Sequence, residues 1–538
     1  MTDEVPETPP EHRSRDRRAG RSSRFLLRRP RGYARGGARA RRHRRRAQGL
    51  GSTLGLTALG AIVPGSGYLV AGRRWLGGAV LLGWLGTIAA LVWYFSRGTD
   101  AALDFVFNPT AVRVAALGLG VALLVWAFVV VTSHRLLRPR DRPRSHTIIG
   151  NLMVVVLLVA GAAPIARAAQ YAMATADGVD TVFQDDVESA TAPQDVTEED
   201  PWAGRARVNV LLLGGDAGED RVGVRTDSVI LASIDTKTGR TTLFSLPRNM
   251  MYAQFPKDSP LHDIYPNGYQ TNQGDPGFDM LNAIYGQVPL LHPGVLGKSD
   301  NEGADAIKQA VSGSLGVPVD YYLLVNLKGF ETVVDALGGI TVNINQPVAI
   351  GGNSSAGIPP NRYLQPGPDQ KLSGYNALWF ARGRYGSDDY QRMDRQRCAI
   401  NAMVEAADPA TLLTRYLGIV KAGKEIVYTD IPRSIAPDFV SLLLRVKKGK
   451  LRSVVFKSSD KFDSGNPDYD YVRKTVDRAL NPPPRKPGSN GAPRPDKTSE
   501  DPVDVCAYHP DGGTGTTDGG DDGTGTTGDT GDVAALEP

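Results

Sequence analysis

The chain has 538 residues, which is more than a single hydrophobic core normally organises, so a membrane region, one soluble domain and tails are the expected partition. Its formal charge is +5, and it contains only seven histidines and two cysteines. No histidines stand in a metal-ligand spacing, which argues against zinc sites and against hydrolases built on a histidine base.

Residues 1–48 form a leader with sixteen arginines and five acidic residues. Such a segment buries too little apolar surface to fold, so we predict that it is disordered. We interpret it as a solvated cytoplasmic tail beside anionic lipid. No groove-reading motif accompanies it, so nucleic acid is not an expected partner.

Four apolar stretches follow, each near the length of a bilayer-spanning helix, at about residues 51–72, 76–95, 113–133 and 148–168. Arginine bias places the leader, Arg73-Arg74 and the loop around 135–144 in the cytoplasm, which conflicts with four crossings. Pro64-Gly65 interrupts the first stretch, so we predict that it is re-entrant and that the other three cross the cell membrane. The alternative is four crossings with a cytoplasmic C-terminal domain.

Three crossings place everything after residue 170 outside the cell. Residues 171–205 are polar and acidic and are predicted to be an extracellular stalk. Residues 206–480 are the predicted catalytic domain. Residues 481–538, rich in Pro, Gly, Thr and Asp, are predicted to be a disordered tail apart from the surroundings of Cys506.

Short apolar runs alternate with helical patterns in residues 206–480 and predict an α/β fold, a layered α-β-α domain with a mixed central sheet. A strand-helix-strand unit is expected over residues 321–344, with the helix stopped by Gly338-Gly339. The predicted strands are Val208–Leu213, Val229–Ile234, Thr241–Leu246, Tyr321–Val325 and Ile340–Ile344.

The second and third strands are joined by a typical hairpin turn. A midpoint between Lys237 and Thr238 places Asp227 opposite Arg248, with Arg225 near the same edge. If the first strand runs antiparallel beside them, Asp216 reaches this edge too. Carboxylates supply the hard oxygens that Mg²⁺ or Mn²⁺ takes, so Asp216 and Asp227 are the candidate metal ligands.

A second basic segment spans residues 381–396. Arg382 and Arg384 point the same way if the segment is extended. Asp389, Arg392 and Gln396 share one face if it is helical. A solvated charged helix is the alternative. Because guanidinium forks match phosphate oxygens two at a time, the two basic segments together predict a pyrophosphate site.

Cys398 and Cys506 are a disulfide candidate, since paired cysteines in an exported domain are more often bridged than free. One buried thiol and one loose thiol are the alternative.

Over most of residues 207–405, the chain resembles the LytR-CpsA-Psr (LCP) family of cell-wall glycopolymer ligases. Val334-Asp335 and Gly338-Gly339 also match the family. The sequence departs from the family pattern at Asn249, where the family usually has Asp. The main motifs are Asn209–Asp216, Arg225–Asp227, Ser245–Arg248, Asn326–Phe330, Leu372–Gly374, Ala381–Arg384 and Asp389–Gln396.

The resemblance implies an LCP-type phosphotransferase that moves a glycopolymer from a polyprenyl-pyrophosphate carrier to a peptidoglycan acceptor, with the lipid tail in an apolar channel. It implies that Asp216 and Asp227 hold magnesium. We expect Asp389 to orient the attacking hydroxyl or to take its proton. The implied pyrophosphate ligands are Arg225, Arg248, Arg382, Arg384, Arg392 and Gln396.

Two other functions fit the same residues. The alternatives are a polyprenyl-pyrophosphate-glycan phosphatase, in which water attacks, and a non-catalytic receptor for wall polymer.

Overall fold

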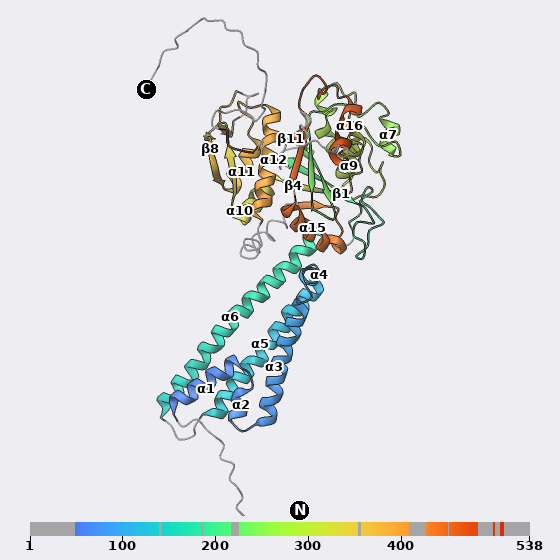
Figure 1. Cartoon of the computed structure of the whole chain (residues 1–538). Coiled ribbons are helices and arrows are strands. Elements are labelled where there is room, and N and C mark those ends of the chain that lie inside the picture. Colours follow the sequence, from blue (N-terminus) through green and yellow to red (C-terminus); the bar gives the residue numbers. More distant parts are fainter. Residues whose placement is uncertain are drawn as a thin grey trace, which may run out of the picture. The chain divides into compact units, whose positions relative to one another are not determined.

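The protein is described by a computed structural model covering residues 49–138, 143–183, 187–216, 225–352, 357–407, 427–449, 451–482, 499–500 and 506–509 (Figure 1). The predicted leader, residues 1–48, and most of the predicted tail lie outside the described residues.

Within the described residues, three helices are long and apolar enough to cross a membrane: Arg74–Tyr94, Pro109–Leu137 and Arg144–Val182. They belong to α3 (Arg74–Phe95), α5 (Pro109–Leu137) and α6 (Arg144–Val182), and the short α4 (Thr99–Val106) lies between α3 and α5 in the chain. They contain the three stretches predicted to cross, and α5, with 29 residues, and α6, with 39, are longer than one crossing needs.

The first apolar stretch is broken where Pro64-Gly65 predicts a break, since α1 (Leu50–Ile62) ends before it and α2 (Ser66–Val70) begins after it. Polar groups tie α1 to α5, because Trp126 Nε1 donates to the Ala61 carbonyl over 2.9 Å and Thr57 Oγ1 lies 3.0 Å from His134 Nδ1. Such side-chain hydrogen bonds between helices contribute on the order of 1 kcal/mol each in an apolar surrounding. The re-entrant path of this stretch stays a prediction.

The C-terminal domain is built on a seven-stranded mixed sheet with the strand order β11-β10-β3-β2-β1-β4-β9. β1 pairs antiparallel with β2 and parallel with β4, and β3 pairs parallel with β10. The strands are β1 (Arg207–Asp216), β2 (Arg225–Asp235), β3 (Thr241–Leu246), β4 (Tyr321–Asn326), β9 (Val427–Thr429), β10 (Leu451–Val455) and β11 (Ser499–Glu500).

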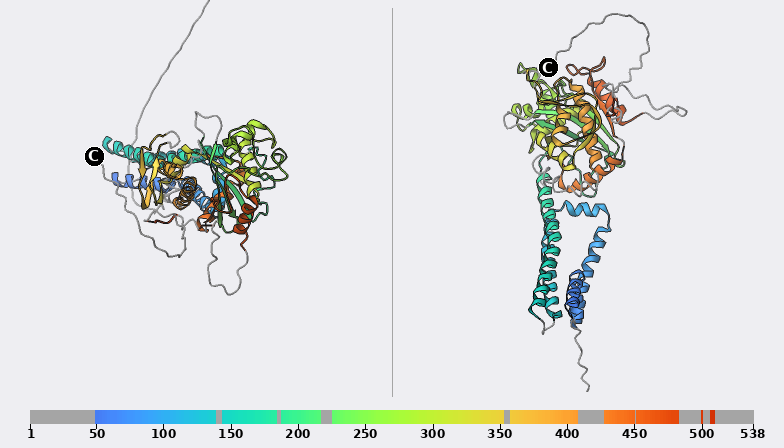
Figure 2. Two further views of the ribbon diagram at one scale, coloured as in Figure 1. Left: turned by 90° about the horizontal axis from the view of Figure 1, so that it is seen from above. Right: turned by 90° about the vertical axis from the view of Figure 1, so that its left-hand side faces the viewer.

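Alternate residues of these strands face two separate cores, as the two-residue period of a strand requires. Leu211, Leu213 and Leu231 pack under one group of helices, whereas Val210 and Ile230 pack on the other face. Figure 2 shows the strands enclosed by helices. The first face is covered by α7 (Pro260–Ile264), η2 (Leu281–Ala283), α8 (Ile284–Leu291), α9 (Glu302–Leu315) and α16 (Tyr469–Leu480). The other face is covered by η4 (Arg433–Ile435) and α15 (Ala436–Lys448). The short η1 (Pro276–Phe278) precedes η2 in the chain. The layered α/β prediction is confirmed.

A second, smaller core lies at one side of the domain (Figure 1). The strand, helix and strand expected over residues 321–344 are present, but the second strand does not join the sheet of the first, because β5 pairs antiparallel with β8. Gly338 and Gly339, both at φ near 90°, turn the chain off the preceding helix into this second layer. The layer contains α10 (Leu327–Leu337), β5 (Ile340–Ile344), β6 (Val348–Ile350), β7 (Arg362–Leu364), β8 (Gly367–Leu372), α11 (Gly374–Arg382) and α12 (Asp389–Ala406).

The predicted stalk, residues 171–205, is not a free spacer. α6 continues to Val182, and the chain after residue 186 packs on the C-terminal domain. Ser189 Oγ donates to Asp305 over 2.8 Å, and the Trp202 ring meets Phe439 with centroids 5.0 Å apart. The polar residues of this segment therefore bond to buried carboxylates of the domain, which composition alone does not reveal.

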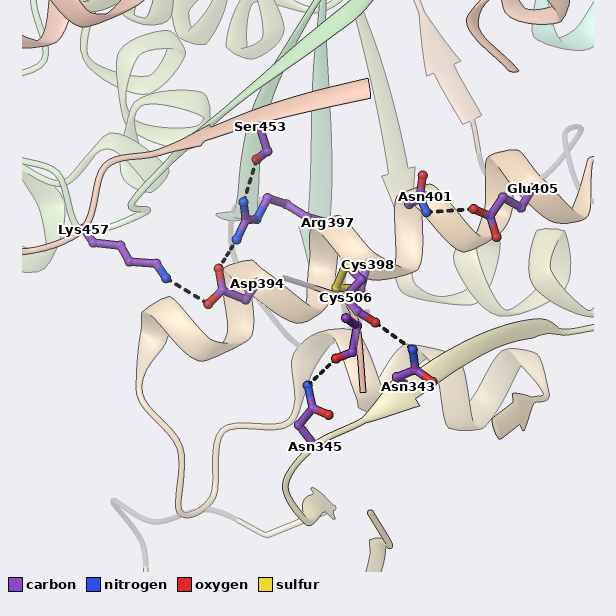
Figure 3. Close-up of a disulfide and its surroundings, with 11 residues drawn as sticks. Asn343, Asn345, Asp394, Arg397, Cys398, Asn401, Glu405, Ser453, Lys457 and Cys506 are labelled. Atoms are coloured by element: carbon purple, nitrogen blue, oxygen red, sulfur yellow. Dashed lines mark hydrogen bonds and ion pairs between the residues drawn. A yellow bond between two sulfur atoms is a disulfide. The ribbon is translucent and has the colours of Figure 1, made fainter. Parts of the chain in front are cut away.

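Cys398 on α12 and Cys506 near the C-terminus form a disulfide across 108 residues (Figure 3). The short segment around Cys506 is also held by side-chain amides, because Asn343 Nδ2 donates to the Cys506 carbonyl over 2.8 Å and Asn345 Nδ2 to the Ala507 carbonyl over 3.0 Å. The bridge fastens this segment to the small core.

Candidate functional site

The first half of the candidate site lies at one end of β1, β2 and β3. Val229 pairs with Leu246, which confirms the hairpin register expected from the sequence. Just beyond this pair, Arg248 Nη1 donates to Asp227 Oδ1 over 2.8 Å. The backbones of Asp216 and Arg225 pair with each other at the same edge, and their side chains lie outside the described part of the structure.

The second half comes from α12 and the loop before it. Arg384 Nη2 donates to Asp227 Oδ1 over 3.1 Å, and Arg392 Nη2 donates to the Asp227 backbone carbonyl over 3.2 Å. Asp389 lies 3.0 Å from Arg392 Nη2 and 3.5 Å from Arg248 Nε. Two carboxylates and three guanidiniums from distant parts of the chain therefore meet in one cluster.

Arg392 is the buried member of this cluster, with a side chain only 2% exposed. Its Nε and Nη1 have no hydrogen-bond partner among the described residues. Burial lowers the pKa of Arg392 to about 10, although Asp389 and Asp227 oppose the shift, so the group stays a cation at neutral pH. A buried cation with two unsatisfied donors is suited to an anionic acceptor.

The charges of the surrounding arginines determine the pKa of the Asp227 carboxyl. Burial alone raises the pKa of its carboxyl, but the positive charges of Arg384, Arg248 and Arg392 outweigh burial, so the net pKa lies below the usual 3.8. The carboxylate is thus fully ionised at neutral pH, as an ion pair or a metal ligand requires.

The lowered pKa predicts an acid-dependent contribution of Asp227 to stability. The contribution is present above the unfolded-state value of 3.8 and is lost as pH falls through the lower folded-state value. We expect the melting temperature of Asp227→Asn to lie below that of the unsubstituted protein at pH 5–7, with a gap that narrows below about pH 4. Thermal unfolding across this pH range checks it, with Asp460→Asn in an exposed loop as control; a gap that does not vary with pH contradicts the pairing.

Arg382 differs from its sequence prediction. Residues 374–382 form the helix α11 and not an extended segment, because Ser373 caps the first turn and Ala377 and Phe380 face the small core. Arg382 closes this helix and lies over the Trp379 ring, 5.2 Å from its centroid. Arg382 and Arg384 therefore do not point the same way as neighbours on a strand.

Gln396 lies one turn beyond Arg392 on α12, as the helical spacing predicts, and its side chain is half-buried. Asp388 caps the helix by accepting from Gln391 N over 2.7 Å. Asp389, Arg392 and Gln396 consequently share a face.

Three residues of α12 outside the predicted set hold the site in place. Arg395 donates to the carbonyls of Phe380 and Gly383, which fixes the loop that leads to Arg384. Arg397 is fully buried, donates to Ser453 Oγ of β10 over 2.8 Å and pairs with Asp394, which also binds Lys457 (Figure 3). The helical spacing shows that these side chains point away from the site, but not what they bind.

Asn249, which stands where an Asp is usual in the motif, turns away from the cluster. Its Nδ2 donates to Ser464 Oγ over 3.1 Å. The carboxylates of the described cluster are thus Asp227 and Asp389.

Comparison with known proteins places this geometry in a family. The sequence model of the LytR_cpsA_psr family matches residues 172–481. A polyisoprenyl-teichoic acid–peptidoglycan teichoic acid transferase, TagU of Enterococcus faecalis, is 27% identical over 322 residues, covering 57% of this chain and 87% of the relative. The TagU transferase of Oceanobacillus iheyensis is 30% identical, covering 42% of this chain and 59% of the relative.

Among solved structures, the crystal structure of B. subtilis TagV is 24% identical, covers 52% of this chain and 98% of that one, and has a TM-score of 0.36. The family match alone extends over more than half of the chain and includes every residue of the cluster. The chain therefore belongs to the LytR_cpsA_psr family.

Proposed function

We propose that this protein is a membrane-anchored phosphotransferase that moves a glycopolymer from a polyprenyl-pyrophosphate carrier to peptidoglycan during cell-wall assembly. Membership of the family and the teichoic acid transferases among the relatives support the reaction class.

The observation that carries the proposal is the arginine cluster around Asp227. Arg248, Arg384 and Arg392 meet there, and Arg392 keeps two buried nitrogens without acceptors among the described residues. Leaving such donors unpaired costs on the order of 1–3 kcal/mol each, so a ligand with several anionic oxygens is favoured at this place. A pyrophosphate supplies them.

A divalent cation fits the same place. Mg²⁺ is commonly held by one or two carboxylates together with substrate phosphate oxygens, and Asp227 is an ionised carboxylate among phosphate-binding groups. We propose that Asp227 and Asp216 hold Mg²⁺ or Mn²⁺. When bound, the metal would neutralise charge on the phosphate oxygens.

In the proposed reaction, an acceptor hydroxyl oxygen attacks the phosphorus next to the sugar. The new P–O bond joins polymer to acceptor as a phosphodiester, and the bond from this phosphorus to the bridging oxygen breaks, so polyprenyl phosphate leaves. Arg248, Arg384 and Arg392 hold the non-bridging oxygens, which is most of what phosphoryl transfer requires. Asp389, placed against Arg392 and Arg248, orients the hydroxyl or accepts its proton.

The three apolar helices support a multi-pass anchor in the cell membrane. We propose a cytoplasmic N-terminus and an extracellular catalytic domain, because the arginine-rich segments then lie inside and peptidoglycan lies on the same side as the site.

Incubation of the purified protein with a polyprenyl-pyrophosphate glycan, Mg²⁺ and peptidoglycan tests the proposal. We expect polymer linked to peptidoglycan and release of polyprenyl phosphate. Polyprenyl phosphate formed at the same rate with or without acceptor would indicate a phosphatase instead, and binding without any turnover would indicate a receptor.

A further inference from the structure

One row of part-exposed side chains runs along α11, and the chain continues from its last residue to Arg384 of the arginine cluster. Tyr375, Trp379 and Arg382 are spaced i, i+4 and i+7, so they share one face of the helix. The opposite residues, Ala377 and Phe380, are buried in the small core. Within the row, Trp379 is half-buried and packs against the same core, so the row lies at the boundary between the small core and solvent. We call these three residues the α11 stripe.

The stripe is ordered by its own contacts. The Tyr375 and Trp379 rings meet edge to face with centroids 6.4 Å apart, and the Arg382 guanidinium lies over Trp379. Arg362 of β7 donates to Asn376 Oδ1 over 2.9 Å, which fixes the start of the helix from the side. Tyr375 nevertheless keeps 45% of its surface exposed, and Trp379 is only half-buried.

Part-exposed aromatic rings held rigidly beside a cation are suited to sugar rings. The face of an aromatic ring carries partial negative charge and attracts the weakly positive C–H groups of a pyranose, while the guanidinium donates to hydroxyl oxygens. Little side-chain entropy is lost on binding, because these rings are already packed on one another. The stripe extends about 10 Å along the helix, the length of a short oligosaccharide.

The position of the stripe identifies which glycan it meets. It ends at Arg382, two residues before Arg384, whose guanidinium bonds to Asp227 in the proposed pyrophosphate site. The first sugars of a lipid-linked polymer are covalently attached to that pyrophosphate and must therefore lie beside it. We propose that the α11 stripe binds the first sugars of the glycopolymer donor, an inference that rests on the proposed function.

The test compares two probes on the full-length protein in detergent: geranylgeranyl pyrophosphate, and the same lipid carrying a disaccharide on its pyrophosphate. For the double variant Tyr375→Ala, Trp379→Ala we expect the Kd for the disaccharide lipid to rise on the order of tenfold. The Kd for the bare lipid should stay unchanged, because the arginine cluster is intact. Tyr428→Ala, which removes a tyrosine that is 56% exposed on β9, is the matched control.

Retention of affinity by Trp379→Phe, which keeps a ring at this position, would support stacking. Equal Kd values of the double variant and the unsubstituted protein for the disaccharide lipid would overturn the inference. The inference would also be overturned if the double variant kept its affinity for the donor lipid and lost binding to a soluble peptidoglycan fragment, because the stripe would then bind the acceptor. Failure of the unsubstituted protein to bind bare geranylgeranyl pyrophosphate would instead contradict the proposed function itself.

Discussion

Replacement of Arg384 by Lys should lower kcat/KM for glycopolymer transfer about 100-fold while the protein stays folded. Arg384 Nη2 donates to Asp227 over 3.1 Å, yet its side chain is 41% exposed, so the substitution leaves no cavity in a core. Lysine keeps the charge but lacks the planar fork that binds a carboxylate and a phosphate oxygen together. The substitution therefore keeps the positive charge and removes the bidentate contact with the reacting phosphate.

The measurement is steady-state transfer from a polyprenyl-pyrophosphate glycan to peptidoglycan, accompanied by thermal unfolding. Arg240→Lys, an exposed arginine at the β2–β3 turn, is the matched control and should leave both quantities unchanged. Normal transfer by Arg384→Lys would remove Arg384 from the site. A large fall in melting temperature would assign the arginine a structural role instead.

The strand half of this site could be predicted from the sequence because a hairpin carries its own register. With the turn centred between Lys237 and Thr238, residues at equal distances from this centre on the two strands lie opposite each other. Asp227 and Arg248 are such a pair, and their side chains are in contact. Local chemistry was sufficient there, since a type of turn determines which residues oppose each other.

The other half was predictable only in part, because its geometry depends on tertiary packing. Arg382 and Arg384 are two residues apart, which is the spacing of side chains on one face of a strand. The chain before them is helical instead, because apolar residues in the range 377–380 pack on the small core. Arg395 bonds to carbonyls of the preceding helix and loop, and Arg397 donates to Ser453 of β10, which lies 56 residues further along the chain. No periodicity within one segment encodes such partners.

Contacts between distant residues also explain why the sequence predicts a stalk after α6, whereas the structure packs this segment on the domain. Its acceptors are buried carboxylates more than 100 residues away, Asp305 and Asp430. Asp430 also accepts from Lys308 Nζ over 2.5 Å and from Tyr322 N over 2.7 Å. Buried charge of this kind joins α9, β4 and the chain just after β9 with the segment that leads from the membrane helices.

Replacement of Lys308 by Met should therefore destabilise the protein by about 3–5 kcal/mol, since the side chains of Lys308 and Asp430 are both fully buried and the substitution leaves Asp430 as an uncompensated charge. The melting temperature should fall by roughly 10 °C. Lys298→Met removes an exposed ion pair with Glu188 and should change stability by less than about 1 kcal/mol.

A second substitution separates loss of charge balance from loss of packing. In Lys308→Met, Asp430→Asn both charges of the pair are removed, and Asn still offers an oxygen to Tyr322 N, so most of the lost stability should return. Thermal unfolding of the four proteins forms the cycle that isolates the pair. If the double variant is as unstable as Lys308→Met, the lysine stabilises the fold through its packing and its bond to the Asp320 carbonyl, and not by neutralising Asp430.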